Sequence, residues 1–227
     1  MANICIIPAR GGSKRIPRKN IKEFLGKPII AYSIQAAIDS NLFDEVMVST
    51  DDPEIAEIAK KLGASVPFMR SSKNSNDFAT TYDVIEEVIL EYKKINQEFD
   101  TLCCLYSCAP FVTSKTLGLA HEKLVEKQFD SVFPIIAFSF PIQRALNRKE
   151  GKISMINEEN LTVRSQDLEE SYHDAGQFYW CKTQELLKSK KLLTANTGGI
   201  VISELEAQDI DTETDWKLAE IKHQLAK

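Results

Sequence analysis

The residues whose types and spacing most clearly predict chemistry are those of 8–20, Pro-Ala-Arg-Gly-Gly-Ser-Lys-Arg-Ile-Pro-Arg-Lys-Asn. Five of the ten residues from Arg10 to Lys19 are basic, although the net charge of the chain is -5. Gly11 and Gly12 let the backbone turn tightly and approach a ligand closely. Backbone N–H groups and fixed cations in such a turn suit a polyphosphate. The alternative is a solvated basic loop, whose like charges would repel one another without a bound anion.

This loop matches neither of two common phosphate-binding patterns. The P-loop pattern Gly-x-x-x-x-Gly-Lys-Ser/Thr does not follow the apolar residues at 4–7. The dinucleotide pattern Gly-x-Gly-x-x-Gly is also missing, which argues against a dinucleotide cofactor.

A pair of carboxylates near the end of the chain is a second candidate for chemistry. Asp209 and Asp211 flank Ile210, and residues two apart on an extended segment project to the same side. Two such carboxylates repel each other unless a cation lies between them, and Mg²⁺ prefers one or two carboxylates together with phosphate oxygens and water. The alternative is that Asp211 caps a terminal helix.

The composition is that of one globular domain that neither binds nucleic acid nor enters a membrane. The 227 residues are 43% hydrophobic and 27% charged, as in ordinary soluble proteins. The acidic balance makes the basic run a local site rather than a nucleic-acid footprint. No apolar run reaches about 18 residues, and the first residues do not resemble a signal peptide.

The cysteines predict a reducing, cytoplasmic environment. Their number is odd, and most lie inside apolar runs, which indicates reduced thiols. Their spacing lacks the paired Cys or His partners of a zinc site. We interpret them as small core residues: Cys5, Cys103, Cys104, Cys108 and Cys181.

Short apolar runs alternate with segments of helical periodicity through the first two-thirds of the chain. This alternation indicates a mostly parallel sheet covered by helices, in which ligands bind beyond the carboxyl ends of the strands. The basic loop, the pair Asp51-Asp52 and the segment 106–113 each follow a predicted strand and can share that edge. Strands are predicted at 4–7, 45–50, 66–69, 101–106 and 130–137, and helices at 28–40, 53–62, 79–94 and 114–127.

Residues 139–176 interrupt this rhythm and are expected to form an inserted arm or hairpin. Phe138, Phe140 and Ile142 alternate with other residues, as in a half-buried strand. An exposed apolar face of this kind favours a two-fold dimer. The alternation then resumes, with predicted strands at 177–182 and 199–202, a helix at 183–189 and a terminal helix after 209–216.

Several stretches resemble the CMP-sialic acid synthetase family of cytidylyltransferases, enzymes that activate nine-carbon 2-keto sugar acids with CTP. They are residues 7–20, Val-Ser-Thr-Asp-Asp at 48–52, Arg70, and Asp-Ile-Asp at 209–211. The resemblance extends over almost the whole chain. It implies one Rossmann-like α/β domain spanning 1–227, with three α/β/α layers, a mostly parallel sheet and a dimerisation arm at 139–176.

Within this family, three stretches resemble the branch that acts on pseudaminic acid: 138–144, 164–167 and 172–180. The sialic acid branch usually has Gln-Pro-Thr-Ser-Pro where this chain has Tyr-Ser-Cys-Ala-Pro at 106–110. The resemblance implies transfer of CMP from CTP to the anomeric hydroxyl of pseudaminic acid, with Mg²⁺ and release of pyrophosphate. Flagellin or other glycan decoration would be the pathway. The alternatives are the same reaction on legionaminic, N-acetylneuraminic or a 3-deoxy-octulosonic acid, and a non-catalytic nucleotide-binding protein of the same fold.

The resemblance also implies roles for individual residues. Arg10, Lys14 and Lys19 match phosphate-binding positions, and Lys19 is the first choice for stabilising charge in the transition state. Asp209 and Asp211 match metal-binding aspartates, one of which would take the proton of the attacking hydroxyl. CTP would also contact Ala9, Gly11, Gly12, Ser13, Asn20, Arg70, Thr80, Thr81 and Tyr106, although the two threonines could simply cap a helix and Tyr106 could fill a strand end.

The sugar acid carries a carboxylate, so its pocket needs cations and amides. The candidates lie in or beside the arm, where each could instead be an ordinary surface or interface residue. His173 could act as an acid or base, because its unperturbed pKa lies near neutrality. In this family the arm exchanges between two subunits, which implies a homodimer. The candidate residues are Gln143, Arg144, Arg164, His173 and Gln177.

Overall fold

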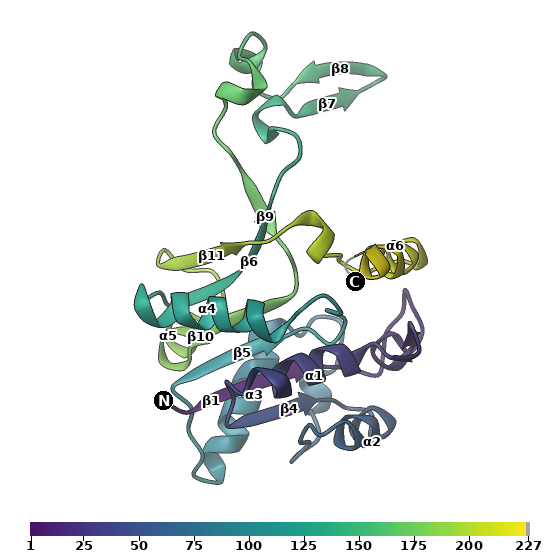
Figure 1. The fold of residues 1–227 in the computed structure, drawn as a ribbon, viewed down its shortest axis with the longest axis vertical. Coiled ribbons are helices and arrows are strands. Elements are labelled where there is room, and N and C mark those ends of the chain that lie inside the picture. Colours follow the sequence, from purple (N-terminus) through teal and green to yellow (C-terminus); the bar gives the residue numbers. More distant parts are fainter. Residues whose placement is uncertain (226–227) are drawn as a thin grey trace.

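A computed structural model describes residues 1–225 of the chain. Its centre is a seven-stranded sheet with the strand order β11-β6-β10-β5-β1-β4, and β9 pairs with β6 at one end of that strand (Figure 1). The strands are β1 (Asn3–Pro8), β4 (Glu45–Ser49), β5 (Thr101–Leu105), β6 (Ser131–Ala137), β9 (Tyr172–Asp174), β10 (Phe178–Lys182) and β11 (Thr197–Val201).

The sheet is mostly parallel, as the sequence predicts. β1 runs parallel to β4 and β5, and β11 runs parallel to β6. β10 is antiparallel to both of its neighbours, β5 and β6. Reversing β10 places its amino end, next to Gly176, at the same edge as the carboxyl ends of β1, β4 and β5.

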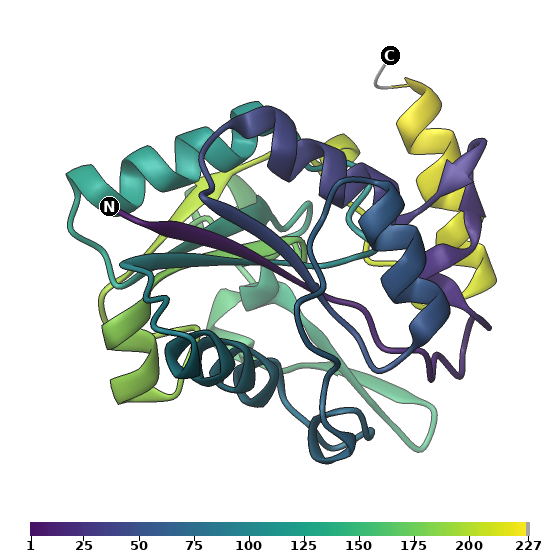
Figure 2. The ribbon, with the colours of Figure 1, turned by 90° about the horizontal axis from the view of Figure 1, so that it is seen from below.

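Helices cover both faces of the sheet and make the three α/β/α layers (Figure 2). Alternate residues of β1 enter the two layers, because side chains of a strand point to opposite faces. Cys5 and Ile7 pack in the cluster formed with α1, α2 and α4, whereas Ile4 and Ile6 pack in the cluster formed with α3 and α5. The helices are α1 (Ile30–Ser40), α2 (Pro53–Lys61), α3 (Thr81–Lys94), α4 (Ser114–Glu126) and α5 (Thr183–Ser189).

A third, smaller cluster joins the terminal helix α6 (Glu213–Leu225) to the loop after β1. Ile16 and Phe24 are fully buried there against Trp216. Phe24 lies on the short strand β2 (Glu23–Phe24), which pairs with β3 (Lys27–Pro28). The segment before α6 therefore packs directly against the basic loop, and this packing brings Asp209 and Asp211 close to the loop.

Two of the sequence-based element predictions that are wrong fail at a proline. The predicted strand at 66–69 is absent: Ser65 makes a single bridge to Met47, and the pairing stops before Pro67, which has no N–H to donate. The predicted helix start at Pro28 is also wrong, because Pro28 pairs with Glu23 in the small hairpin and α1 begins at Ile30.

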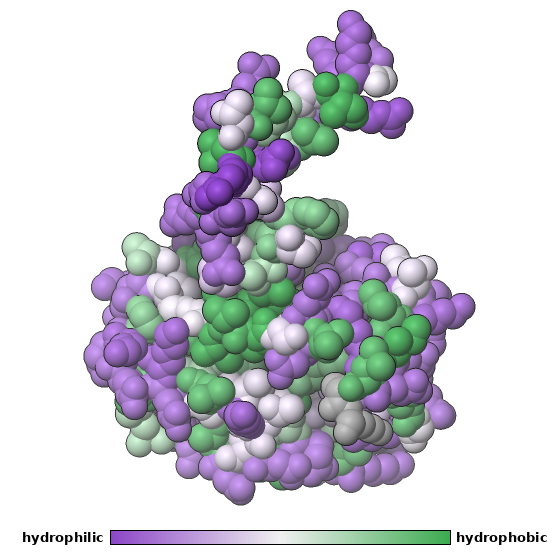
Figure 3. Space-filling model, turned by 45° about the horizontal axis from the view of Figure 1, so that its top comes forward, coloured by the Kyte–Doolittle hydropathy of each residue, from purple (hydrophilic) through white to green (hydrophobic). Residues whose placement is uncertain are grey.

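The segment after β6 leaves the body of the molecule and ends in a hairpin of β7 (Leu146–Lys149) and β8 (Lys152–Met155) (Figure 1). The predicted half-buried strand over 138–142 is not formed. The chain bends after Ala137, and the short 3-10 helix Ile142–Arg144 follows Pro141. Phe140 is 81% exposed, and Figure 3 shows apolar side chains on the arm and on the body around its base. The expected exposed apolar surface is therefore present without the expected strand.

Within residues 1–225, none of the helices combines the length and apolarity that a membrane span requires.

Candidate nucleotide site

A cleft of about 480 Å³ lies at the carboxyl ends of β1, β4 and β5. It joins four segments that are distant in sequence: the basic loop, the residues from Arg70 to Val84, the end of β5, and the segment before α6. Of the predicted site residues, the cleft is lined by Arg10, Ser13, Lys14, Lys19, Asn20, Arg70, Thr80, Thr81, Tyr106 and Asp209. This juxtaposition is the one expected from a mostly parallel sheet.

The basic loop is shaped by close packing against the end of β4. The Ala9 N–H donates to the carbonyl of Ser49 at 2.9 Å, and the Gly11 N–H donates to the Asp51 carboxylate at 2.9 Å. A Cβ on Gly11 would lie 2.6 Å from a carboxylate oxygen of Asp52, so only glycine fits there. Ala9 is fully buried. Ala9, Gly11 and Gly12 do not line the cleft in this structure, and neither does Asp211.

The cations of the loop are held by carboxylates from two sides of the cleft. Arg10 and Lys14 both pair with Asp77, while Arg15 lies 2.6 Å from Asp211. Lys19 donates to the Ile210 carbonyl at 2.7 Å, with Asp211 3.7 Å away, and its side chain is only 22% exposed. Lys19 is therefore the most firmly positioned of these cations.

Asn20 is a buried connection between the loop and the end of β5. Its side-chain amide donates to the Arg10 carbonyl at 2.8 Å. Its carbonyl oxygen accepts from the Ser107 hydroxyl at 2.8 Å and from the Cys108 thiol at 3.3 Å. Burial raises the pKa of Cys108 to about 11, so the thiol stays protonated and remains a donor. Asn20 thus fixes the backbone at Arg10 as well as lining the cleft.

Arg70 is a buried cation that is 8% exposed and lies against β4. Its Nε donates to the Ser49 hydroxyl at 3.0 Å, and its Nη2 donates to the Ser49 carbonyl. Burial lowers the pKa of Arg70, but a guanidinium still remains charged at neutral pH. The result is a rigid positive group in the wall of the cleft.

The two threonines at the start of α3 have different environments. Thr80 caps the helix: its hydroxyl accepts from the Asp83 N–H at 3.2 Å, and the Asp83 carboxylate accepts from the Thr80 N–H. This is the capping role that the sequence offered as the alternative to CTP binding. Thr81 lies 3.3 Å from the Tyr106 hydroxyl. Burial raises the pKa of Tyr106, whose ring packs edge-on against Tyr179 at 5.6 Å. Tyr106 and Thr81 therefore form one ordered wall.

Asp209 and Asp211, the predicted metal-binding pair, lie on the segment before α6. Burial and the neighbouring charge of Asp211 raise the pKa of Asp209, so the two carboxylates repel each other. Asp211 does not cap α6; Thr212 accepts from the Asp215 N–H at 3.3 Å instead. In the part of the chain that is described, no cluster of three or more His, Cys, Asp or Glu side chains could hold a metal. Asp209 lines the cleft, whereas Asp211 lies just outside its lining and pairs with Arg15. One or two carboxylates beside phosphate oxygens are ligands of the kind that Mg²⁺ prefers.

The sugar-acid candidates do not converge on the cleft of their own chain. Gln143 donates to the Glu169 carbonyl at 2.8 Å, and Arg164 pairs with Asp167. His173 packs against Phe138 at 4.9 Å between ring centroids. Arg144 is exposed on the arm. The structure thus brings together most of the nucleotide candidates. It leaves Gln143, Arg144 and Arg164 on the projecting segment, and His173 on β9, where that segment rejoins the sheet.

Gln177 lies in the body of the molecule, unlike Gln143, Arg144 and Arg164. It is 3% exposed, and its side chain donates to the Glu206 carbonyl at 2.6 Å. Its backbone carbonyl accepts from the Tyr106 N–H at 2.9 Å. In this structure Gln177 positions the end of β5 and does not line the cleft.

Sequence reasoning missed several residues that line the cleft. Arg15 belongs to the basic run and could have been chosen from its charge alone. Asp77 offered no signal, because a single acidic residue in a polar loop has no distinctive spacing. The missed residues are Pro8, Arg15, Asp77, Ala79, Val84, Ser107, Cys108, Gly176, Gln208 and Ile210.

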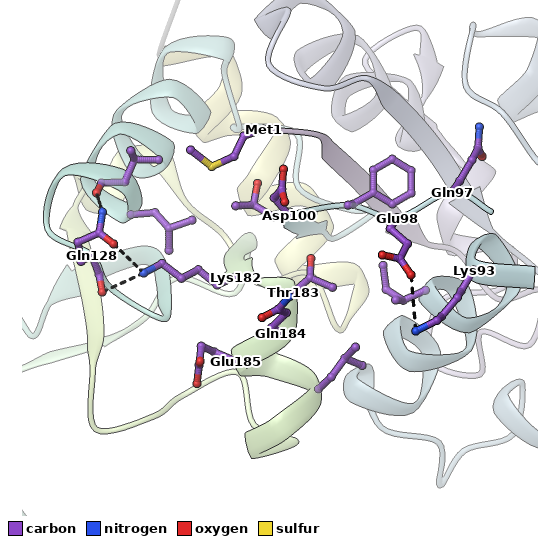
Figure 4. Close-up of a pocket in the computed structure, with 16 residues that line it drawn as sticks. Met1, Lys93, Gln97, Glu98, Asp100, Gln128, Lys182, Thr183, Gln184 and Glu185 are labelled. Carbon is purple, nitrogen blue, oxygen red and sulfur yellow. Dashed lines mark hydrogen bonds and ion pairs between the residues drawn. The ribbon is translucent and has the colours of Figure 1, made fainter.

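A second cleft of about 490 Å³ lies at the opposite edge of the sheet (Figure 4). Its lysines are held by local partners: Lys93 lies 3.6 Å from Glu98, and Lys182 lies 3.2 Å from the Gln128 side chain. None of the predicted site residues lines it. The two clefts differ in volume by only about 10 Å³, so the chemistry of the lining residues rather than volume identifies the candidate nucleotide site.

The first cleft combines clustered cations, the carboxylate of Asp209 and the ring of Tyr106 at the carboxyl ends of parallel strands. These are the groups that a nucleotidyltransferase needs, because transfer of a nucleotidyl group develops charge on phosphate oxygens and on the leaving group.

Comparison with known proteins defines the class further. A family model described as Cytidylyltransferase matches residues 4–211. The pseudaminic acid cytidylyltransferase of Campylobacter jejuni is 43% identical over 226 residues, which cover 99% of this chain and 97% of that protein. The CMP-N,N'-diacetyllegionaminic acid synthase of Legionella pneumophila is 31% identical over 97% of this chain and 95% of its own length.

A solved structure shares the fold. CMP:2-keto-3-deoxy-manno-octonic acid synthetase complexed with CTP has a TM-score of 0.71 to this chain at 18% identity, covering 100% of this chain and 99% of that one. The chain belongs to the cytidylyltransferase family. The expectations of an α/β fold, of a CTP-dependent enzyme and of resemblance to the pseudaminic acid branch are confirmed. The alternative of a non-catalytic protein finds no support, since these relatives are named as enzymes.

Proposed function

We propose that this chain transfers CMP from CTP to the anomeric hydroxyl of pseudaminic acid. The observation that carries this proposal is the 43% identity over 99% of the chain to a pseudaminic acid cytidylyltransferase. That identity is higher than the 31% found with the legionaminic acid enzyme. The main alternative is the same reaction on legionaminic or N-acetylneuraminic acid, which would need a differently shaped sugar pocket.

In the proposed reaction, the anomeric oxygen forms a bond to the α-phosphorus of CTP. The bond from that phosphorus to the oxygen bridging to the β-phosphate breaks, and pyrophosphate leaves with the electron pair. Lys19, Arg10 and Lys14 stabilise the charge that develops on the phosphates. Ser13, which lines the cleft, supplies an additional donor once CTP is bound. The backbone at Gly11 and Gly12 would contribute only if the loop moves, because the Gly11 N–H donates to Asp51.

The base and ribose of CTP would lie against the opposite wall of the cleft. Arg70 supplies a fixed cation, and Asn20 supplies an amide whose carbonyl is already oriented by Ser107 and Cys108. Thr81 and Tyr106 form the surface beside the base.

Mg²⁺ would be held by Asp209 and Asp211. The raised pKa of Asp209 supports this, because a cation between the two carboxylates relieves their repulsion. When bound, Mg²⁺ offsets the charge of the phosphates. We assign the proton of the attacking hydroxyl to Asp211, which must first release Arg15, its partner at 2.6 Å.

The sugar acid would bind between two chains of a homodimer. The arm at 139–176 carries Gln143, Arg144, Arg164 and His173 away from its own cleft, which supports their delivery to the cleft of a second copy. Gln177 would act from the body beside that cleft. We place the reaction in the cytoplasm, since all five cysteines are free thiols in the structure.

Product analysis tests this function. The protein is incubated with CTP, Mg²⁺ and pseudaminic acid, and the products are identified by phosphorus NMR and mass spectrometry. The proposal predicts one phosphodiester product of the mass of CMP-pseudaminic acid and an equal amount of pyrophosphate. A product with legionaminic or N-acetylneuraminic acid, but none with pseudaminic acid, would reject the substrate and retain the chemistry.

A further inference from the structure

The carboxylate of Asp77 is paired with Arg10 and Lys14, the two cations that a polyphosphate would need. This carboxylate lies 2.9 Å from Arg10 Nη1 and is also bonded to Lys14 Nζ, and all three residues line the nucleotide cleft. Arg10 makes one more bond to the same loop, to the Asn76 carbonyl at 3.1 Å. The carboxylate of Asp77 therefore takes the place of an anion between these two cations.

The loop that carries Asp77 is bonded to α3 near its two ends, whereas its tip is bonded to the basic loop across the cleft. At the first end, Glu87 accepts from the Ser71 N–H at 2.7 Å. At the second end, Thr80 is fixed by the capping box of α3. Between them the tip is exposed, and Phe78 is 92% exposed. The bonds to Arg10 and Lys14 are what join the tip to the basic loop across the cleft.

These contacts are weak enough to exchange with a ligand. The side chains of Asp77, Arg10 and Lys14 are 41%, 38% and 79% exposed, and exposed ion pairs contribute little stability. A ligand with several phosphate oxygens offers more charge and more acceptors to the same two cations. An uncharged nucleoside offers none.

We propose that Asp77 competes with bound polyphosphates for Arg10 and Lys14, and that this competition sets how tightly the cleft holds them. In the free protein it holds Arg10 and Lys14, and only a ligand with enough phosphate charge displaces it. After transfer and loss of pyrophosphate, Asp77 returns to the two cations and opposes rebinding of the released polyphosphate. This inference deepens the proposed function and rests on its assignment of the cleft to CTP.

The test compares ligand affinities by calorimetry for the wild type and Asp77→Asn, which preserves the size of the side chain. The probes are CTP, inorganic pyrophosphate and cytidine, each with Mg²⁺ and with EDTA. Loss of the competing carboxylate should tighten CTP and pyrophosphate binding about three- to tenfold, as expected for removal of weak exposed pairs. Cytidine affinity should stay unchanged. Thermal melting checks that the variant is folded.

Glu54→Gln is the matched control. Glu54 pairs with Arg18 of the same loop at 2.6 Å and is exposed, but neither residue lines the cleft. Glu54→Gln removes one negative charge, as Asp77→Asn does, but at a site outside the cleft that solvent and salt screen. Its effect on CTP affinity should therefore be less than about twofold. An equal tightening in both variants would overturn the proposal in favour of general electrostatics.

Other results would also overturn it. Unchanged CTP affinity in Asp77→Asn would show that Asp77 is not displaced. Weaker CTP binding only with Mg²⁺ would place Asp77 in the metal site. If the wild type binds pyrophosphate but not CTP, the proposed function fails, whereas tighter pyrophosphate binding in the variant still supports the role of Asp77. If neither polyphosphate binds either protein, both proposals fail.

Discussion

At the scale of single residues, Lys19 is the cation best placed to stabilise the transition state. Its ammonium is anchored to the Ile210 carbonyl and lies close to Asp211. Removing one preorganised donor to developing charge typically slows the chemical step about 10²–10³-fold. Lys19→Met should therefore lower kcat by about this factor, with a smaller change in the affinity for CTP, measured by pyrophosphate release and by calorimetry.

Lys73→Met is the matched control for Lys19→Met. Lys73 is exposed in the loop before α3 and does not line the cleft. Its loss should leave kcat unchanged. A Lys19→Met enzyme with normal kcat would refute the assignment of Lys19, whatever the effect on the KM for CTP.

Asp209 gives a pH-dependent prediction. Burial and Asp211 raise its pKa above the ordinary value of 3.8, so the folded protein binds this proton more tightly than the unfolded chain. Stability is then lost as the pH rises from the ordinary value through the raised pKa. Asp209→Asn should stabilise the ligand-free protein at pH 7 by about 0.5 kcal/mol or less, because the residue is only partly shielded and solvent screens its carboxylate. It should give no gain at about pH 3, below the ordinary pKa of an aspartate.

The measurement is thermal unfolding of the wild type and Asp209→Asn across this pH range. The same variant should lose its response to Mg²⁺ in pyrophosphate release, because one carboxylate of the pair has been removed. A variant that is less stable than the wild type at pH 7 would contradict the account of Asp209 as a repelled carboxylate.

At the scale of elements, the start of α3 separates a structural role from a binding role. Thr80 caps the helix, and replacing a threonine cap by alanine costs about 1 kcal/mol. Thr80→Ala should lower the free energy of unfolding by about this amount and change CTP affinity little, with Thr80→Ser restoring stability. Thr81→Val should weaken CTP binding without loss of the cap. Denaturant unfolding measures the loss of stability, and calorimetry measures the affinity for CTP. Weaker CTP binding in Thr80→Ala, together with lower stability in Thr81→Val, would contradict these assignments.

The alternation of strands and helices was predictable from sequence because apolar periodicity and buried strands leave direct patterns. The 183–189 helix is found at its predicted bounds. Prolines misled the analysis at 28 and 67, where the pattern of neighbouring apolar residues does not reveal whether Pro ends pairing or begins a helix. The reversed direction of β10 was not predictable, since a strand's sequence does not encode its orientation.

The candidate site was predictable where charge is concentrated. The basic run and Asp209 and Asp211 were recognisable because like charges in close spacing need a partner. Asp77 and the contacts of Ser107 and Cys108 with Asn20 were not, because they depend on loops that meet only in three dimensions. Hydrogen-bond geometry, rather than residue type, reveals that Asn20 connects two elements.

At the scale of the whole molecule, the projecting arm predicts a homodimer. The arm exposes apolar side chains, among them Phe140 at 81%, and exposed apolar surface of this kind favours association. Light scattering at micromolar concentration should give twice the chain mass. Phe140→Ser should shift the protein toward monomer and raise the KM for the sugar acid, while CTP affinity stays unchanged because the nucleotide cleft is built within one chain.

Phe78→Ser is the control for the arm variant. Phe78 is more exposed than Phe140, at 92%, but lies outside the arm. Its replacement should leave the dimer intact. A wild-type protein that scatters as a monomer would contradict both the dimer and the proposed delivery of the arm residues to a second copy.

The central claim is that this cleft transfers CMP to pseudaminic acid, and pyrophosphate release tests it most directly. We would measure kcat/KM with CTP and Mg²⁺ for pseudaminic, legionaminic and N-acetylneuraminic acids. The account predicts turnover of pseudaminic acid well above the other two, and loss of that turnover in Lys19→Met. Preference for another sugar acid would contradict the substrate assignment, and absence of turnover with all three would contradict the proposed reaction.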